Sequence, residues 1–215
     1  MSDITFFHSP RSRSAVTRAL LEELGVPFDL VPINLEAGEQ RSPEFLAINP
    51  MGKVPAIRHA GTLITEQPAI ILFLADLYAD KGLAPALNDP LRADYLRWMV
   101  FYGSCMEPAM MDHSLPNRAT LPRQQCGYGT YEEVIAVVAD QLSAGPWLLG
   151  ERFTAADVLW GMAMQYGFQF RLIPELPALR AYADRVLARP AITRAREQDA
   201  LLAAQQSIDV LAAVV

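Results

Sequence analysis

The chain has 215 residues, of which 52% are apolar and 20% are charged, and its formal net charge is −6. This composition is typical of a folded globular protein with one large domain or two small ones, and it excludes a disordered chain. The acidic balance disfavours nucleic-acid binding, which needs a basic surface, and no apolar run approaches the roughly 18 residues of a membrane-spanning helix.

The first 80 residues alternate between strand-like and helix-like patterns. A β-prone run, Ile4–Phe7, precedes apolar residues at helical spacing that begin after Ser12 or Ser14, and Gly25 is placed to end that helix. The later predicted elements are a strand over Phe28–Leu35, a short helix over Pro43–Ile48, a hairpin of Val54–Arg58 with Leu63–Thr65, and an apolar helix over Pro68–Tyr78. The order β-α-β-α-β-β-α predicts a thioredoxin-like domain, in which helices cover a mixed four-stranded sheet.

A break in composition separates this predicted domain, residues 1–80, from the rest of the chain. Residues 81–90 are rich in Gly, Pro, Asn and Asp and are predicted to form a linker. Beyond the linker the periodicity is helical, which predicts an all-α domain over residues 91–215. Its expected elements are a helix over Leu91–Met106 that breaks near Pro108, a loop over Asn117–Gly129, a helix over Tyr131–Leu142, and a buried helix that follows Thr154.

The start of that buried helix carries a capping signal. Thr154 is expected to be the N-cap, and Asp157, three residues later, completes a capping box. Phe153 precedes the cap and is placed to act as a hydrophobic staple. A capping box stabilises a helix, so we expect a role in folding and stability and no part in chemistry.

Two short segments of the first domain indicate a ligand. Within residues 49–57, Pro55 has no N–H to donate to a sheet, and a cis Val54–Pro55 bond would leave the N–H and C=O of Val54 pointing outward. Backbone groups presented in this way bind a peptide as a neighbouring strand would. Residues Glu66–Pro68 resemble the start of a helix, whose first N–H groups favour an anion. A small anionic peptide suits both segments, and glutathione is the candidate.

These two segments resemble the glutathione-binding half of soluble glutathione transferases, with the features of a bacterial-like serine-type member. In that family the Val–Pro peptide is cis, and an acidic residue followed by Ser holds the γ-glutamyl end of glutathione. Here Gln67 follows Glu66, so the resemblance implies that the γ-glutamyl carboxylate is bound by an amide and by backbone N–H groups. The run Trp147–Arg152 before the capping box is also similar to the family, and the resemblance extends from Phe6 to about Arg196.

The resemblance implies that the glutathione thiol is ionised to a thiolate, which is the nucleophile. The loop before the first helix supplies three serines and two arginines, at the helix end where the dipole favours an anion. The catalytic position of the family falls on Arg11, with Ser12 beside it, and we predict that Ser12 donates its hydroxyl to the thiolate. Ser9 and Ser14 are alternatives, although Ser14 is equally expected to be only a helix cap. Arg11 or Arg13 would add positive potential.

Two other mechanisms of the family are disfavoured. Cys105 and Cys126 lie outside this loop, so a cysteine-type mechanism has no thiol there. Their number and spacing indicate neither a metal site nor a required disulfide, and a reduced cytosolic protein is expected. Phe6 and Phe7 occupy the strand in which a tyrosine-type enzyme would carry its catalytic Tyr. His8 is expected to pack or to be solvated rather than to contact the ligand.

Further binding residues follow from the resemblance. Gln40 and Lys53 are candidates for the glycyl carboxylate of glutathione, with Arg41 as a third, although each could instead be a solvated surface residue. The full predicted glutathione site consists of Arg11, Gln40, Lys53, Val54, Pro55, Glu66 and Gln67.

The acceptor site is expected on the second domain, where methionines and aromatic residues at helical spacing would form an adaptable apolar pocket. The candidates are Phe101, Tyr102, Cys105, Met106 and Met110, with Tyr166 and Phe168 on the other side. At least half of these residues are expected to belong to the core instead.

The sequence therefore predicts a cytoplasmic, homodimeric glutathione transferase that conjugates glutathione to a small hydrophobic electrophile, a detoxification reaction. One alternative is a glutathione-dependent isomerase or dehalogenase, although the Ser-Ser-Cys run of the maleylacetoacetate isomerase branch is replaced by Arg11–Arg13. Another is a non-catalytic protein that binds glutathione or hydrophobic ligands on the same fold. No metal, nucleic-acid or membrane partner is expected, and the chain begins with its first strand rather than with a signal peptide.

Overall fold

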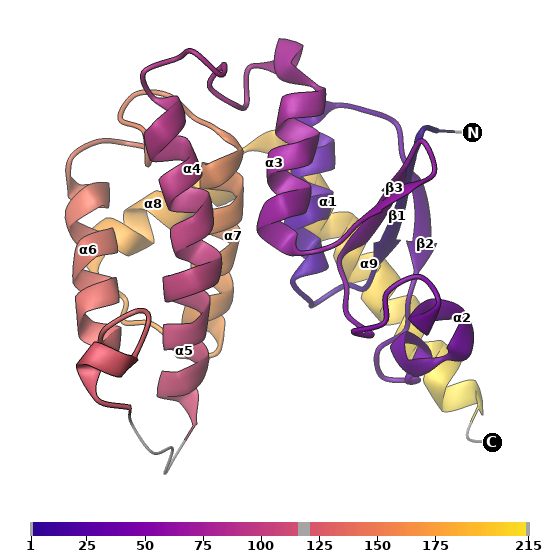
Figure 1. Ribbon diagram of the computed structural model, residues 1–215. Helices are drawn as coiled ribbons and strands as arrows, with labels where there is room; N and C mark the ends of the chain where they lie inside the picture. Colours follow the sequence, from indigo (N-terminus) through magenta and orange to yellow (C-terminus); the bar gives the residue numbers. More distant parts are fainter. Residues whose placement is uncertain (1, 116–120, 214–215) are drawn as a thin grey trace. The chain divides into compact units, whose positions relative to one another are not determined.

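The computed structural model describes residues 2–115 and 121–213, with 209–213 described by their backbone alone. The loop predicted over Asn117–Gly129 lies partly outside the described residues, and its described part contains a short 3-10 helix, Arg123–Gln125. The chain divides into two compact units (Figure 1). Unit 1 consists of Met1–Leu77 with Arg189–Val215, and unit 2 is Tyr78–Ala188.

Unit 1 is built on a four-stranded mixed sheet with the strand order β2-β1-β3-β4. The strands are β1 (Ile4–His8), β2 (Asp29–Pro32), β3 (Ala56–His59) and β4 (Thr62–Ile64). The β1–β2 pair is parallel, whereas β1–β3 and β3–β4 are antiparallel. The mixed four-stranded sheet of the thioredoxin-like prediction is therefore confirmed, although β2 is shorter than the predicted strand.

The helices of unit 1 are α1 (Ser14–Leu24), α2 (Pro43–Leu46), α3 (Gln67–Leu77) and α9 (Pro190–Ala213), with a 3-10 turn at Glu39–Arg41. As predicted, α1 ends at Gly25, whose φ of 64° lies in the left-handed region that glycine adopts without strain. Alternate residues of β1 face opposite sides of the sheet. Phe7 packs with Phe45 of α2 in a small core, whereas the fully buried His8 is hydrogen-bonded by residues of α1 and α9.

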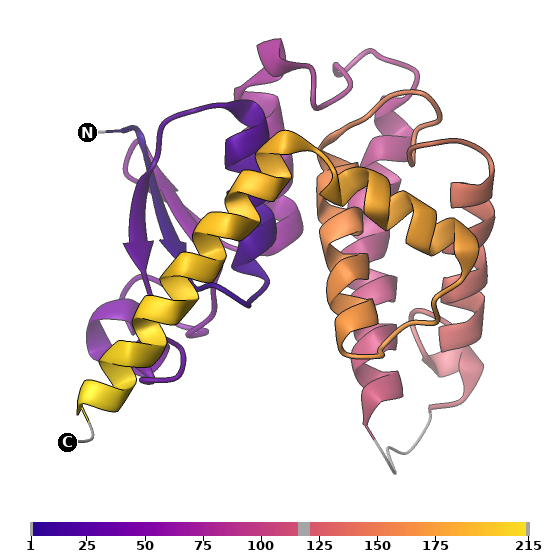
Figure 2. The same ribbon diagram turned by 180° about the vertical axis from the view of Figure 1, so that it is seen from behind.

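The last helix, α9, belongs to unit 1 because it packs along α1 (Figure 2). Arg189 pairs with both carboxylate oxygens of Glu23 at 2.8 Å, and Arg18 donates to Asp199 at 2.8 Å. The predicted division into 1–80 and 91–215 differs from this arrangement, since helical periodicity shows that residues 190–213 are helical but not which unit they join.

Unit 2 is helical throughout its regular elements. These are α4 (Arg92–Phe101), a π-helical segment (Tyr102–Met106), α5 (Glu107–Ser114), α6 (Tyr131–Ser143), α7 (Ala155–Gln169) and α8 (Pro177–Leu187), with 3-10 turns at Ala79–Lys81 and Arg123–Gln125. The predicted all-α character of this part of the chain is confirmed. Of the described residues, none forms a helix with the length and apolarity that crossing a bilayer requires.

The predicted break near Pro108 is not observed as an interruption. The chain remains helical through the π-helical segment and into α5, where Pro108 lies in the first turn. A proline is tolerated at that point because the first N–H groups of a helix have no obligatory partner within it. The local disturbance is a π-helical segment rather than a loop.

The predicted capping box at the start of α7 is present. Asp157 Oδ2 accepts the backbone N–H of Thr154 at 2.8 Å, and Asp157 Oδ1 accepts the N–H of Leu148 at 2.9 Å. The hydroxyl of Tyr182 on α8 also donates to Oδ1, at 2.9 Å. Because Thr154, Asp157 and Tyr182 are all fully buried, this carboxylate joins three parts of unit 2 in its interior.

The same carboxylate gives unit 2 a pH dependence. Burial raises the pKa of Asp157, against the lowering effect of the hydrogen bonds from Leu148 and Thr154. A carboxyl whose pKa is higher in the folded chain holds its proton to higher pH there than in the unfolded chain. Relative to Asp157→Asn, the unfolding free energy should therefore be greatest below about pH 4 and should fall as the pH rises through the folded-state pKa.

Urea unfolding followed by tryptophan fluorescence measures this difference, because all three tryptophans, Trp98, Trp147 and Trp160, belong to unit 2. The wild type and Asp157→Asn are compared at several pH values between about 4 and 7. If the stability advantage of the wild type over Asp157→Asn grew with pH, the raised pKa of Asp157 would be contradicted.

Candidate functional site

The sheet brings two of the predicted segments together. β1 and β3 are antiparallel, and their ladder ends with Phe7 opposite Ala56. The same register carried one residue further places Pro55 beside His8, where the chain leaves β1. The Val54–Pro55 peptide is cis, as predicted. The Val54–Pro55 segment and the serine-rich loop after β1 therefore share one end of the sheet.

The third predicted segment, at the start of α3, is tied to the same place. The side chain of Gln67 is buried, and its Nε2 donates to the carbonyl oxygen of Arg13 at 2.6 Å. Gln67 Oε1 is also buried and has no hydrogen-bond partner among the described residues. The amide thus uses an N–H to hold the loop before α1, and within the described part of the chain its unpartnered atom is the acceptor Oε1.

Two residues of this region have a left-handed backbone. Arg11 has a φ of 56° and Glu66 a φ of 64°, and each lies shortly before a helix of unit 1. Ala60 and Arg171 share this conformation, at the β3–β4 turn and after α7. A positive φ is strained for residues with a Cβ atom, and such strain is concentrated at functional sites and tight turns.

The three serines of the loop form one hydrogen-bonded cluster. Ser12 Oγ lies 2.7 Å from Ser14 Oγ and donates to Ser9 O at 2.7 Å. It also accepts the backbone N–H of Ser14 at 3.1 Å, and the N-cap position of α1 is occupied by Arg13. The expectation that Ser14 is only the helix cap is therefore wrong, because Ser14 is the first residue of α1 and is fully buried. Ser12 is half-buried, whereas Ser9 and Ser14 are buried.

His8 connects this cluster to α9. Its Nδ1 lies 2.9 Å from Ser14 Oγ, and its Nε2 lies 2.9 Å from Asp199 Oδ1. Asp199 Oδ1 also accepts a hydrogen bond from Arg18, whose second amino group donates to Gln198. His8 does pack in the interior, as expected, but it is hydrogen-bonded at both ring nitrogens, which the sequence did not predict.

Asp199 is the residue that sequence reasoning missed. It occupies the same face of α9 as three buried apolar residues, Ile192, Ala195 and Ala203. A lone carboxylate on an apolar helical face needs a buried partner, because an unpaired charge in the interior is costly. That signal was available in the sequence, although it does not name the partner.

The candidates for the glycyl carboxylate lie on two adjacent turns. A Cβ atom at Gly52 would lie 2.8 Å from Gln40 O and 2.9 Å from Arg41 Nη1, so the two turns are in close contact. Gly52 has a φ of 59°, which a residue with a Cβ atom rarely adopts. Gln40 Oε1 is buried without a hydrogen-bond partner among the described residues, while the side chain of Lys53, next to Gly52, is exposed.

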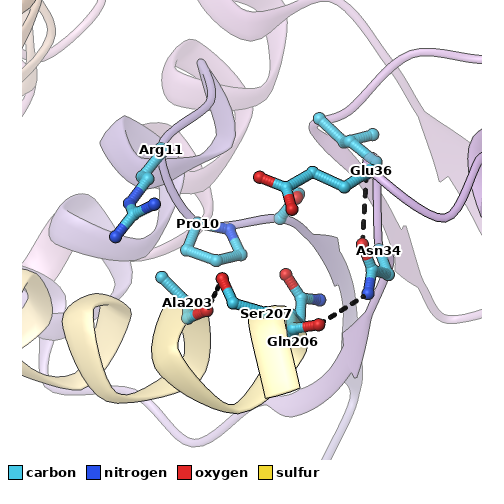
Figure 3. A pocket seen from close by; sticks show the side chains of 9 residues that line it. Pro10, Arg11, Asn34, Glu36, Ala203, Gln206 and Ser207 are labelled. Atoms are coloured by element: carbon cyan, nitrogen blue, oxygen red, sulfur yellow. Dashed lines mark hydrogen bonds between the residues drawn. The ribbon is translucent and has the colours of Figure 1, made fainter. Parts of the chain in front are cut away.

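A pocket of about 210 Å³ opens beside the serine loop (Figure 3). Its walls are Ser9–Arg11 and Asn34–Glu36, and α9 contributes Ala203, Gln206 and Ser207. Arg11 and Glu36 lie on opposite sides of it. Asn34 holds two of the walls together, since it donates to Gln206 O at 3.3 Å and accepts the N–H of Glu36 at 3.1 Å. The pocket therefore combines apolar surface with polar side chains of both charges.

The predicted acceptor residues of unit 2 divide into two groups. Tyr102, Met106, Met110 and Phe168 are buried in the core of the unit, as was expected for at least half of the candidates. Phe101 and Cys105 are half-buried, and Tyr166 is exposed. Only the second group presents side-chain surface to a ligand.

The described residues contain no group of three or more His, Cys, Asp and Glu side chains arranged to hold a metal ion. Cys105 and Cys126 are both free thiols. The serine loop and the start of α3 bring together hydroxyl, amide, guanidinium and backbone N–H groups, which are hydrogen-bond donors suited to an anion.

Comparison with known proteins agrees with this geometry. The sequence matches the family model of the glutathione S-transferase N-terminal domain over residues 2–76 and that of the C-terminal domain over residues 127–190. A glutathione S-transferase from Hyoscyamus muticus is 30% identical over 204 residues, which cover 88% of this chain and 96% of that protein.

Two solved structures have the same fold. A glutathione transferase from Methylococcus capsulatus has a TM-score of 0.78 at 28% identity, over 92% of this chain and 99% of that one. A sphingomonad glutathione S-transferase complexed with glutathione has a TM-score of 0.76 at 28% identity, with the same coverage of 92% and 99%. The fold, both family models and a relative that aligns over most of its length agree, and the chain is an enzyme of the glutathione transferase family.

Proposed function

We propose that this enzyme is a serine-type glutathione transferase in which Ser12 stabilises the thiolate of bound glutathione. The observation that supports the proposal best is the place of Ser12. It is a half-buried hydroxyl shortly before α1, in the loop that follows β1. The sheet register brings the cis Val54–Pro55 segment to the end of β1 from which this loop begins, and Gln67 is hydrogen-bonded to Arg13, the residue after Ser12.

Each part of glutathione has a partner in unit 1. The backbone of Val54 binds the peptide portion as a strand would, and the start of α3 at Glu66 and Gln67 binds the γ-glutamyl end. The glycyl carboxylate is assigned to Gln40 and Lys53. These residues lie on the two turns that are in close contact at Gly52. Arg41 is the third candidate there, although its Nη1 also donates to Met51 O at 3.4 Å.

The chemistry needs a thiolate at neutral pH. Ser12 donates its O–H to the sulfur, and the N-terminus of α1 with the guanidiniums of Arg11 and Arg13 adds positive potential. The reaction then forms a sulfur–carbon bond while the leaving group departs with its electron pair. We assign the acceptor to a small hydrophobic electrophile.

The remaining expectations stay part of the proposal. They are a first domain that binds glutathione, a second domain that supplies acceptor-site residues, a homodimer, and a cytoplasmic location. Size-exclusion chromatography with light scattering tests the dimer directly.

A second candidate function is glutathione binding without turnover. It is favoured by the hydrogen bond of Ser12 to Ser9 O, because this bond directs the single Ser12 proton inward rather than toward a ligand. If this arrangement persists when glutathione binds, the thiol gains no hydroxyl donor and keeps an ordinary pKa.

The thiol pKa of bound glutathione separates the two functions. We expect the wild type to hold it well below that of free glutathione, and Ser12→Ala to raise it by about 1–2 units, since a hydrogen bond to a charged group is worth roughly 1.5–3 kcal/mol. The measurement is the pH dependence of the ultraviolet thiolate absorbance at saturating glutathione. Ser143→Ala is the matched control, because it removes an exposed hydroxyl at the end of α6.

The outcomes are distinct. A depressed pKa that Ser12→Ala does not change would transfer the role to Ser9, Ser14 or the arginines. Bound glutathione with an ordinary pKa in the wild type would refute the transferase mechanism and leave the binding function.

A further inference from the structure

A buried hydrogen-bond chain leads from α9 to Ser12. At its inner end, Asp199 Oδ1 lies 2.9 Å from His8 Nε2. His8 Nδ1 lies 2.9 Å from Ser14 Oγ, which in turn lies 2.7 Å from Ser12 Oγ. His8 and Ser14 are fully buried, whereas Ser12 is half-buried. The chain therefore connects an interior carboxylate with the hydroxyl that the proposed function places against the glutathione sulfur.

The same residue types form the triads of serine hydrolases, but this chain is arranged differently. Ser14 is 0% exposed, so no substrate carbonyl reaches its Oγ. That oxygen is already within hydrogen-bond distance of Ser9 N, Ser9 O, His8 Nδ1 and Ser12 Oγ. Ser14 is thus excluded as a nucleophile, and what remains to it is the transfer of a proton along the chain.

The donors and acceptors of the chain are compatible with proton transfer from Ser12 toward His8. Asp199 accepts from Arg18 at 2.8 Å, and a carboxylate beside a guanidinium is an acceptor, so the hydrogen between it and His8 belongs to Nε2. In a neutral imidazole Nδ1 then carries a lone pair, which at 2.9 Å is one of two acceptors for the single Ser14 proton, the other being Ser9 O at 2.8 Å. The single Ser12 proton has two acceptors at the same distance, Ser9 O and Ser14 Oγ, both at 2.7 Å. The relay uses the arrangement in which each hydroxyl proton is directed toward His8.

We propose that His8 is the proton acceptor for the glutathione thiol and that it acts through Ser14 and Ser12. The inference rests on the proposed function, because it needs the sulfur beside Ser12. In the step, the S–H bond breaks and its proton passes to Ser12 Oγ, while the Ser12 proton passes to Ser14 Oγ and the Ser14 proton to His8 Nδ1. The products are a thiolate and an imidazolium, and no proton leaves the protein.

Two charged groups face this imidazole. Asp199 on α9 accepts its Nε2–H and stabilises the imidazolium, while Arg18 on α1, which binds the same carboxylate, opposes it. The ring of Phe6, with its centroid 5.0 Å away, contributes no charge. The new positive charge is separated from the thiolate by two hydroxyl groups, and their attraction favours the ionised pair. Asp199 and Ser14 are therefore positioning residues, and their effect appears in the protonation of bound glutathione.

The number of protons released on binding tests the proposal in the wild type alone. Titration calorimetry at pH 7 in buffers of different ionisation enthalpy counts the protons released, and ultraviolet absorbance counts the thiolate formed. If His8 takes the thiol proton, the thiolate appears with almost no proton release. If water or the buffer takes it, one proton is released for each thiolate, and the inference is overturned.

Two variants give a second test. In His8→Asn an amide replaces Nδ1 as the partner of Ser14 but takes up no proton, and in Asp199→Asn the charge that supports the imidazolium is absent. Each is expected to raise the thiol pKa of bound glutathione by about one unit and to increase proton release to one per thiolate. Glu23→Gln is the matched control: it breaks the pair with Arg189 between α1 and α9 without contact with the serines, and both values should stay unchanged.

The failures of the two proposals are distinguishable. Absence of a thiolate in the wild type refutes the proposed function and the inference together. A thiolate that depends on Ser12 but is formed with full proton release, or that His8→Asn and Asp199→Asn leave unaltered, refutes only the inference. Should both variants fail to fold, the proton count of the wild type still decides.

Discussion

Asp157→Ala is expected to lower the unfolding free energy of unit 2 by about 4 kcal/mol, because it leaves several buried donors without an acceptor at roughly 1–3 kcal/mol each. The donors are Leu148 N–H, Thr154 N–H and the hydroxyl of Tyr182. They belong to the turn before α7, to its N-cap and to α8, so the loss affects three elements together. Denaturant unfolding followed by tryptophan fluorescence measures the change within unit 2.

The second capping box of the same unit supplies the control. Thr130 and Glu133 form it at the start of α6, where the Glu133 carboxylate accepts the N–H of Thr130 at 3.0 Å. This box is solvent-accessible, and Glu133→Ala should therefore cost only about 1 kcal/mol, as is typical of a cap. Equal losses at the two boxes would show that burial of Asp157 does not matter.

Gly161→Ala is expected to destabilise unit 2 by about 2 kcal/mol, although alanine is the better helix former by roughly 1 kcal/mol. A Cβ atom at this position in α7 would lie 2.5 Å from both Cβ and Cγ1 of Val186 on α8. Real Cβ contacts are longer, and Val186 is fully buried, so α8 must move away from α7. The measurement is again the urea midpoint from tryptophan fluorescence.

A double-mutant cycle isolates the steric cause. Val186→Ala alone leaves a cavity and should cost about 2 kcal/mol, yet in the Gly161→Ala background it also removes the collision. The double variant should therefore be more stable than the sum of the two single changes predicts. Simple additivity would mean that the helices are not in direct contact at this point.

Local chemistry in the sequence was sufficient for most elements of unit 1. Gly25 ends α1, a cis Val54–Pro55 peptide precedes β3, and α3 begins at Gln67, as their residue types predict. The failures have a different origin. Pro108 was expected to interrupt a helix, but a π-helical segment carries the chain past it, and such a segment depends on packing rather than on propensity.

The residues of the candidate site also divide into those that local motifs predict and those that depend on long-range contacts. The sequence placed Ser12, Val54 and Gln67 in one predicted site through local motifs, and the strand register and the Gln67–Arg13 hydrogen bond bring these segments to one end of the sheet. The partner of His8 is 191 residues away, on a helix whose pairing no local pattern encodes. Long-range polar contacts of this kind were beyond the sequence, because periodicity reports which face is buried but not what covers it.

Unit 1 is formed from two separate stretches of the chain, and this determines when its contacts can form during synthesis. Residues 78–188 form unit 2 and are inserted between α3 and α9 of unit 1. During translation the ribosome therefore completes every residue of unit 2 before it produces the helix that carries Asp199. The sheet and α1 cannot pack against α9 until it is synthesised, more than 100 residues later. The His8–Asp199 contact is therefore among the last that the growing chain can form.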